Sequence, residues 1–158
     1  MDRIVCTLST SILLFMTQSV FAVGSITETK NGENISGQDY RQLVSIPDES
    51  RELMRQDMMY HLSALNEIIS NLASNDLDAA SDVAEKRLGR SSMGKHRGTG
   101  MGPGKFMPPE MRSIGWGMHD AASELSRFAK EGDLKGAYSA LQKVTSSCVA
   151  CHYSYRTR

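Results

Sequence analysis

Residues 148–156 read Cys148-Val149-Ala150-Cys151-His152-Tyr153-Ser154-Tyr155-Arg156, and this stretch decides the fold. On a helix, positions i, i+3 and i+4 lie on one face, so Cys148, Cys151 and His152 point the same way. The residues before them carry apolar side chains at the same spacing, at Leu134, Ala137, Leu141 and Val144. We therefore expect a helix that begins after an N-cap at Asp133 and bears both thiols on its buried face.

The pattern Cys-x-x-Cys-His is the one by which a c-type haem is attached. Each thiol adds to one vinyl group of the haem, and the imidazole of His152 reaches the iron from one side. A redox-active cysteine pair is favoured at a helix N-terminus, whereas this pair ends a helix. A zinc site needs four ligands, and the other three histidines are not spaced as in a zinc finger. The sequence thus predicts one covalent haem c, held by Cys148, Cys151 and His152.

The N-terminal residues have the features of an export signal. The apolar run 4–16 is shorter than the roughly 20 residues that span a bilayer, and residues 20–22 have the small-x-small form of a signal peptidase site. We expect residues 1–22 to be cleaved, the protein to be periplasmic, and no membrane span to remain. Cys6 leaves with the signal. Residues 23–45 are polar and without period, so we expect a flexible leader.

Residues 46–158 are expected to form an all-α, antiparallel four-helix bundle. The first helix begins near Pro47 and has one apolar stripe, made of Met54, Met58, Leu62, Leu65, Ile69 and Leu72. The second runs over residues 77–88, where Gly89 is expected to supply a left-handed stop. The third begins at Pro109 and carries apolar residues as far as Gly132. Short connections between the first two and the last two helices favour the antiparallel arrangement.

A loop rich in Gly, Pro and Met separates the second and third helices, over residues 89–109. A helix cannot persist through such a composition, and a loop of this length in a compact domain is often functional. Its soft donors are Met93, His96, Met101 and Met107. Because thioether and imidazole suit copper, a copper site in the loop is one hypothesis, although scattered Met in a Gly-rich loop is more often without a ligand.

The overall charge gives no sign of a nucleic-acid partner. The 158 residues contain 18 basic and 18 acidic side chains, whereas a nucleic-acid surface needs a concentrated basic excess. Ten methionines are unusual beside one Trp, and they indicate a pliable core, a haem ligand, or both.

The ending Cys-x-x-Cys-His-x-x-Tyr-Arg resembles that of cytochrome c′ and its low-spin relatives, over roughly residues 47–158. This resemblance implies a four-helix bundle with haem attached to the last helix, and a homodimer formed through the early helices. Arg55-Gln56 is similar to an Arg-Gln pair of the family, which places the distal residue four positions after the arginine, at Met59. The resemblance also implies that Arg55 lies near the haem propionates and Arg156 beside the proximal histidine.

The residue opposite His152 decides the function that we expect. A methionine ligand gives a low-spin haem with a raised potential, as in an electron carrier that is not an enzyme and serves redox partner proteins. An open position gives a five-coordinate iron that binds nitric oxide or carbon monoxide. We favour the carrier with Met59 as ligand, although the apolar stripe is centred on Met58. A ligand from the loop, His96 or one of its methionines, is the remaining alternative.

Overall fold

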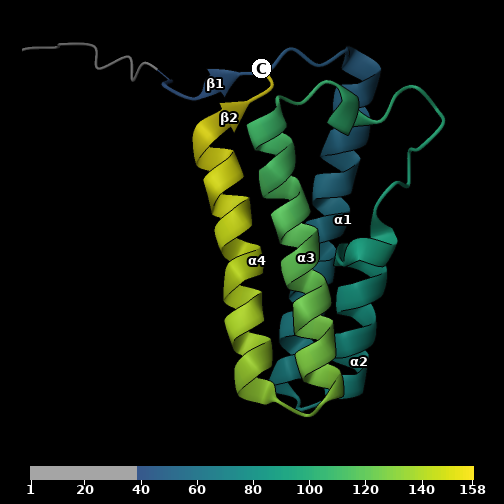
Figure 1. Ribbon diagram of the computed structural model, residues 1–158, viewed down its shortest axis with the longest axis vertical. Coiled ribbons are helices and arrows are strands. Elements are labelled where there is room, and N and C mark those ends of the chain that lie inside the picture. Colours follow the sequence, from purple (N-terminus) through teal and green to yellow (C-terminus); the bar gives the residue numbers. More distant parts are fainter. Residues whose placement is uncertain (1–38) are drawn as a thin grey trace, which may run out of the picture. The chain divides into compact units, whose positions relative to one another are not determined.

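The computed structural model describes residues 39–158, and four helical segments run up and down this part of the chain (Figure 1). They are α1 (Asp48–Ala73), α2 (Leu77–Val83), α3 (Pro109–Lys130) and α4 (Leu134–Ser154). A π-helical turn, η1 (Ala84–Leu88), extends α2, and two single 3-10 turns, η2 (Arg90–Ser92) and η3 (Pro103–Lys105), lie in the long loop. The expected all-α four-helix bundle is confirmed. The expected signal peptide, residues 1–22, lies outside the described residues.

Local signals in the sequence fix the helix ends. The first turn of α1 carries Asp48 and Glu49, which favour the positive end of the helix dipole. After α1 the chain turns at Asn75, which has a φ of 57° and is of a residue type that tolerates the left-handed conformation. The side chain of Asp133 accepts a hydrogen bond from the backbone N–H of Gly136 at 2.8 Å, so the expected N-cap of α4 is confirmed.

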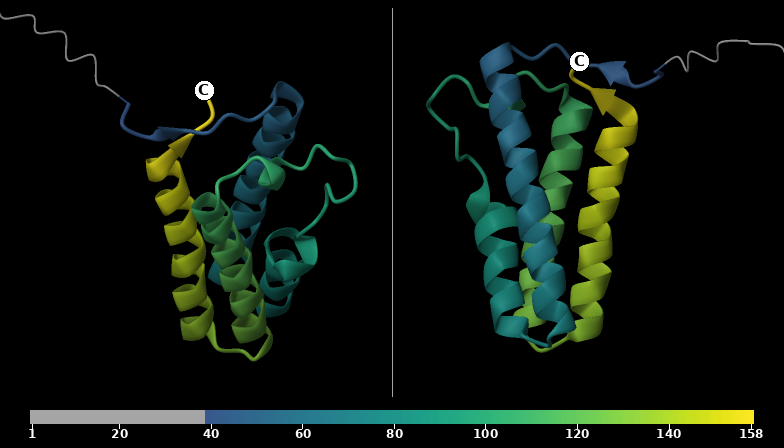
Figure 2. Two further views of the ribbon diagram at one scale, coloured as in Figure 1. Left: turned by 45° about the horizontal axis from the view of Figure 1, so that its top comes forward. Right: turned by 180° about the vertical axis from the view of Figure 1, so that it is seen from behind.

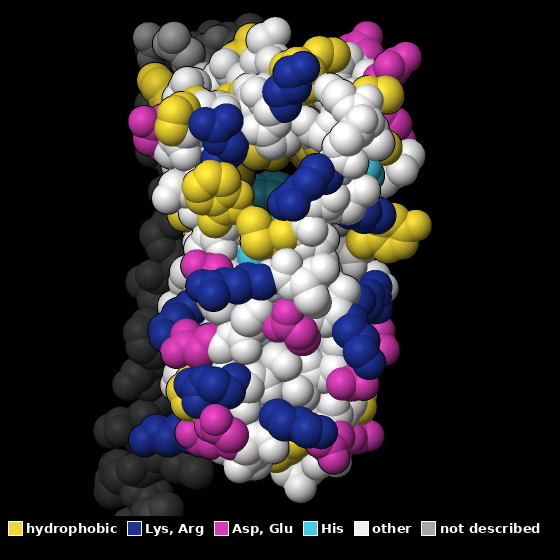
Figure 3. Space-filling model, turned by 45° about the vertical axis from the view of Figure 1, so that its right-hand side comes forward, with side chains coloured by type: hydrophobic (Ala, Val, Ile, Leu, Met, Phe, Trp, Pro, Cys, Tyr) yellow, Lys and Arg dark blue, Asp and Glu magenta, His cyan; other side chains and the backbone are white. Residues whose placement is uncertain are grey.

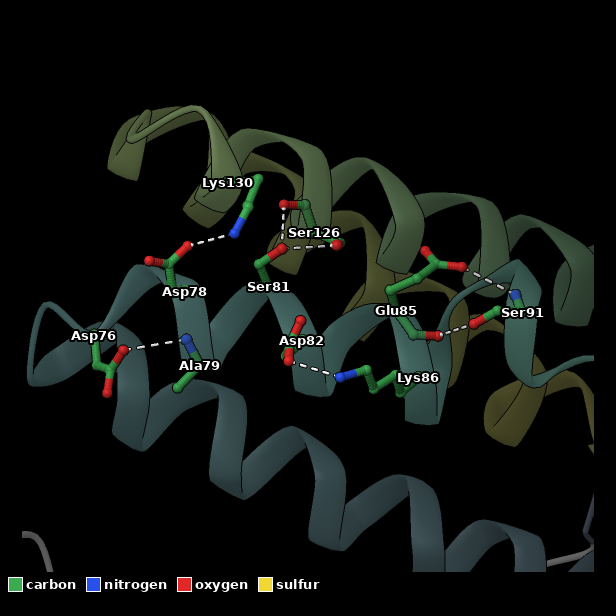
Figure 4. Close-up of polar contacts among 10 residues, drawn as sticks. All are labelled: Asp76, Asp78, Ala79, Ser81, Asp82, Glu85, Lys86, Ser91, Ser126 and Lys130. Atoms are coloured by element: carbon green, nitrogen blue, oxygen red, sulfur yellow. Dashed lines mark hydrogen bonds and ion pairs between the residues drawn. The ribbon is translucent and has the colours of Figure 1, made fainter.

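Hydrogen bonds cap the first turn of α2 and connect α2 to α3 (Figure 4). The carboxylate of Asp76 caps α2 by accepting from the N–H of Ala79 at 3.1 Å. Ser81, one of the buried polar side chains, donates its hydroxyl to the carbonyl of Ser126 at 2.9 Å. These bonds satisfy groups that the α2–α3 contact removes from water.

The end of the second helix differs from our expectation. Gly89 has φ −71° and ψ −176°, an extended conformation open to any residue, so the prediction of a left-handed stop there was wrong. The structure gives another reason for a glycine at position 89. A Cβ on Gly89 would collide with the carboxylate of Glu85 and would lie 2.8 Å from the hydroxyl oxygen of Ser123. The glycine therefore serves a close approach to α3.

The main core fills the bundle between its helices, with side chains from α1, α2, η1, α3 and α4. In α1 its members are Ala64, Ile68 and Leu72, whereas Leu62 and Ile69 of the expected stripe are exposed. The buried face of α1 is rotated because this helix packs most closely on α2 and η1, while α4 packs most closely on α3. Accordingly, α1 and α4 diverge toward the end that carries the C-terminus (Figure 2).

At that end, a short parallel ladder joins two distant segments. Strand β1 (Gln42–Leu43) pairs with β2 (Tyr155–Arg156), and the next residue, Val44, is buried. Residues 23–45 were expected to form a flexible leader. Residues 23–38 of that range lie outside the described residues, and residues 42–44 carry the ladder and the buried Val44. A pairing of two residues is too short to give a periodic pattern in the sequence, so the ladder was not predicted.

None of the helices in the described range 39–158 is long and apolar enough to cross a membrane.

Candidate functional site

The last turns of α4 present two free thiols and an imidazole. Cys148 is exposed, Cys151 is half-buried, and His152 is exposed. Partial burial raises the pKa of both thiols, and the charge of Cys148 raises the pKa of Cys151 further. A redox-active cysteine needs the opposite shift, so these thiols are suited to a stable bond rather than to disulfide exchange.

Cys151 faces an apolar cluster to which every part of this end of the bundle contributes. The buried members are Val44, Ile46, Met54 and Met111, and the half-buried members packed on them are Phe106, Met107, Cys151 and Tyr155. We call this set the methionine cluster. Three of its side chains are thioethers, which are polarizable and adapt to the shape of a bound group. The cluster therefore gives the thiol face of α4 a dry, pliable wall.

Met54 was expected on the buried stripe of α1, whereas Val44 and Ile46 were not predicted to belong to the site. Val44 lies in the segment that was expected to be a flexible leader, and Ile46 directly follows that segment. Their alternation, apolar at 44 and 46 around a serine, was the available signal for an extended segment with one buried face.

His152 lines an open hollow of about 410 Å³ with Asp39, Tyr40, Arg41 and Tyr153. Asp39 forms an ion pair with Arg41, at 2.7 Å between the carboxylate and the guanidinium. Hydrogen bonds from the side chain and the backbone of Arg41 lower the pKa of Asp39 to about 2, so this carboxylate is ionised at neutral pH. A fixed negative charge therefore lines the hollow of the histidine.

Arg156 lies close to this carboxylate. Its Nε is 3.6 Å from Oδ2 of Asp39, and this buried Nε has no hydrogen-bond partner. Its Nη1 donates to the carbonyl of Arg158 at 3.0 Å. Arg156 therefore lies beside Asp39, which lines the hollow of His152. The unpartnered Nε of Arg156 lies next to that carboxylate.

Met59 and Arg55 lie elsewhere on α1. They line a second open hollow of about 380 Å³ together with Gln56, Tyr60 and Ser63, and no α4 residue takes part. Arg55 forms an exposed ion pair with Glu52 at 2.7 Å. Arg55 and Met59, one helical turn apart, therefore lie on one face of α1.

The neighbouring methionine has a different position. Met58 is 39% exposed, against 60% for Met59. It lies one helical turn after Met54, on the same face of α1, and Met54 packs in the methionine cluster beside Cys151. Of the two residues, Met58 therefore lies on the helix face that adjoins the thiols.

The histidine of the long loop is held by a carboxylate of α1. His96 contacts the carboxylate of Asp57 through Nε2 at 2.9 Å, and Lys95 contacts the same carboxylate at 3.3 Å. Figure 3 shows the face that bears α2 and the loop, where histidine side chains appear in a hollow between hydrophobic and basic groups. Within residues 39–158, no group of three or more His, Cys, Asp or Glu side chains is arranged to hold a metal. The loop is docked by ion pairs, which lends no support to a copper site.

The family model described as cytochrome c′ matches residues 108–156, which include all of α3 and α4. This match over part of the chain supports membership of the cytochrome c′ family. Members are electron carriers or haem-binding proteins with a covalent haem c. Comparison with curated proteins and with solved structures found no match.

The residues at this end of the bundle fit a haem c. Two neutral, free thiols at the spacing of the attachment motif share a helix face with an exposed imidazole. The methionine cluster offers apolar contact to a macrocycle. The buried, unpartnered Nε of Arg156 is suited to a negative group at the edge of the same site.

Proposed function

We propose that this protein is a periplasmic monohaem cytochrome that transfers electrons through a haem iron ligated by His152 and a methionine. The observation that carries the proposal is the joint position of two free thiols and an imidazole on one end of α4, next to a methionine-rich apolar cluster. When bound, the haem supplies an iron that gains and loses one electron.

Each part of the site has a role in that proposal. Cys148 and Cys151 anchor the group by thioether bonds, and His152 binds the iron through a neutral ring nitrogen. Met54, Met107 and Met111 exclude water from the buried side, which favours the less charged, reduced state of the site. The exposed edge of α4 at Cys148 leaves an approach for a redox partner protein.

The distal ligand is proposed to be a methionine of α1. The Arg-Gln offset supports Met59, and the shared face with Met54 supports Met58. We propose Met59 as the ligand, with Met58 as the alternative, since both side chains are exposed. Each residue is replaced by Ala in otherwise intact holoprotein, and the ferric absorption and EPR spectra are recorded. Loss of the low-spin signal in Met59→Ala alone supports Met59, and the same loss in Met58→Ala alone would make Met58 the ligand.

A gas-binding, five-coordinate cytochrome is the second candidate. Its supporting observation is that neither Met58 nor Met59 is fixed by packing, since both side chains are exposed. The wild-type ferric protein separates the two candidates. A low-spin signal with a methionine-to-iron charge-transfer band supports the carrier. A high-spin signal, with carbon monoxide binding that displaces no ligand, would replace it by the gas-binding function.

The periplasmic location rests on the expected signal peptide. Cell fractionation and N-terminal sequencing of the mature chain test it. A mature protein that begins at Val23 in the periplasmic fraction is the expected result, and an intact N-terminus in the cytoplasm would contradict it. The homodimer implied by the resemblance stays a prediction, for which sedimentation of the holoprotein is the measurement.

A further inference from the structure

The segment before α1 is fixed against the end of α4. Strand β1 pairs in parallel with β2, in the register Gln42 to Tyr155 (Figure 1). The backbone N–H of Val44 then donates to the carbonyl of Arg156 at 2.8 Å. From the first turn of α1, Arg51 donates to the carbonyl of Thr157 at 3.4 Å. These contacts hold residues 39–44 next to the last turn of α4 and its histidine.

A histidine that binds a metal through one ring nitrogen donates the N–H of the other nitrogen to a carboxylate, a carbonyl or water. That partner fixes the tautomer and raises the basicity of the ligand. His152 therefore needs an acceptor on the side away from the iron. The structure offers candidates among the residues that line its hollow.

Among the side chains of that hollow, one acceptor is well placed. Arg41 carries only donors. Tyr40 and Tyr153 are 90% and 82% exposed, and a neutral phenol oxygen is a weaker acceptor than a carboxylate. This leaves the carboxylate of Asp39, which its low pKa keeps ionised.

The carboxylate of Asp39 can accept one hydrogen bond more than it does. Its Oδ1 accepts from the backbone N and Nε of Arg41, at 3.1 and 2.9 Å, and its Oδ2 accepts from Nη2 at 2.7 Å. A carboxylate has about four acceptor sites, and the Nε of Arg156 at 3.6 Å is too distant to use the fourth. One site on Oδ2 is therefore free, beside the hollow that His152 lines.

We propose that Asp39 is a positioning residue for His152, whose carboxylate accepts the imidazole Nδ1–H when Nε2 binds the iron. The inference rests on the proposed function and adds to it a residue outside the segment 108–156 that matches the family model. The bond orients the ring and strengthens its donation to the iron. Stronger donation stabilises the oxidised state, so Asp39 lowers the reduction potential.

The test compares the full-length holoprotein with Asp39→Asn and Asp39→Glu. As a matched control, Asp82→Asn removes an exposed aspartate that pairs with Lys86 on α2. We expect Asp39→Asn to raise the midpoint potential. In proteins that also carry Ala at the distal methionine, so that the ferrous iron is five-coordinate, it should lower the iron–histidine stretching frequency. Asp39→Glu should restore both in part, and Asp82→Asn should change neither. An Asp39→Asn protein that matches Asp82→Asn in both readouts overturns the inference.

Hydrogen exchange at the amide of Val44 shows whether β1 stays docked in Asp39→Asn. If that amide loses protection, the Arg41→Gln variant is measured instead. This variant removes the guanidinium donors that compete for the carboxylate, and it leaves Asp39 in place. The iron–histidine frequency should then rise, and an unchanged or lower frequency overturns the inference. A wild-type chain without haem, by contrast, would mean that the proposed function itself has failed.

Discussion

Val44 donates its backbone N–H to the carbonyl of Arg156 at 2.8 Å, and so the residues before α1 are joined to those just after the haem-attachment motif. This bond continues the β1–β2 ladder and lies beside the methionine cluster, in which Val44 is buried. The cofactor site therefore includes a segment more than a hundred residues away in the sequence. Its consequences for stability and for the site are open to measurement.

The packing of the segment before α1 should contribute to global stability. Ile46 is 3% exposed, so Ile46→Ala removes buried methyl groups and should lower the free energy of unfolding by about 2–5 kcal/mol. The matched control is Leu43→Ala, since Leu43 is 54% exposed and should cost well under half as much. Urea unfolding followed by circular dichroism gives both values. Equal effects would mean that the segment is not docked in solution.

The cap of α2 should have a measurable effect. Asp76→Ala removes the acceptor of the Ala79 N–H and should destabilise the protein by about 1 kcal/mol (Figure 4). Asp82→Ala, which breaks only an exposed i,i+4 pair with Lys86, should destabilise the protein less. Thermal unfolding under identical conditions compares them. A larger loss for Asp82→Ala would contradict the role of the cap.

Acid should weaken the bundle through His61. Burial lowers the pKa of this histidine, and the charge of His119 lowers it further, whereas Asp57 opposes the shift and Lys95 adds to it. The unfolded chain then binds the proton more readily, so stability falls as the pH drops below the ordinary histidine pKa of about 6.5. Urea unfolding between pH 7.5 and about 5.5 should show a decline that is smaller in His61→Asn. Equal declines in the two proteins would remove His61 as the cause.

The copper hypothesis for the loop has a direct test. Because His96 is held by Asp57, a protein with Met93, His96, Met101 and Met107 replaced should bind copper no more weakly than the wild type. Titration of both holoproteins with Cu(I) against a competing chelator measures this. A large loss of affinity in the variant would restore the loop as a metal site.

Local chemistry allowed much of the fold to be predicted. The turn at Asn75, the cap at Asp133 and the shared face of Cys148 and Cys151 follow from residue type and helical spacing alone. The buried face of α1 could not be predicted in the same way, because apolar residues occur on more than one side of that helix. Which side faces inward depends on how closely α2 approaches.

Two features of the site were beyond pattern analysis for a similar reason. The ladder between Leu43 and Arg156 spans two residues, too few for a period, and it joins segments that no local signal relates. The hollow shared by Asp39 and His152 follows from that ladder. The choice between Met58 and Met59 depends on the rotation of α1, which spacing alone left open.

Covalent haem attachment through Cys148 and Cys151 is the central claim, and the intact mass of the protein tests it most directly. The full-length chain is made in cells that mature c-type cytochromes, together with a Cys148→Ser/Cys151→Ser variant, and both are measured under denaturing conditions. The mature wild-type chain should carry the added mass of one haem, and the variant should carry none. A wild-type chain without added mass, or a variant that retains it, would contradict the account.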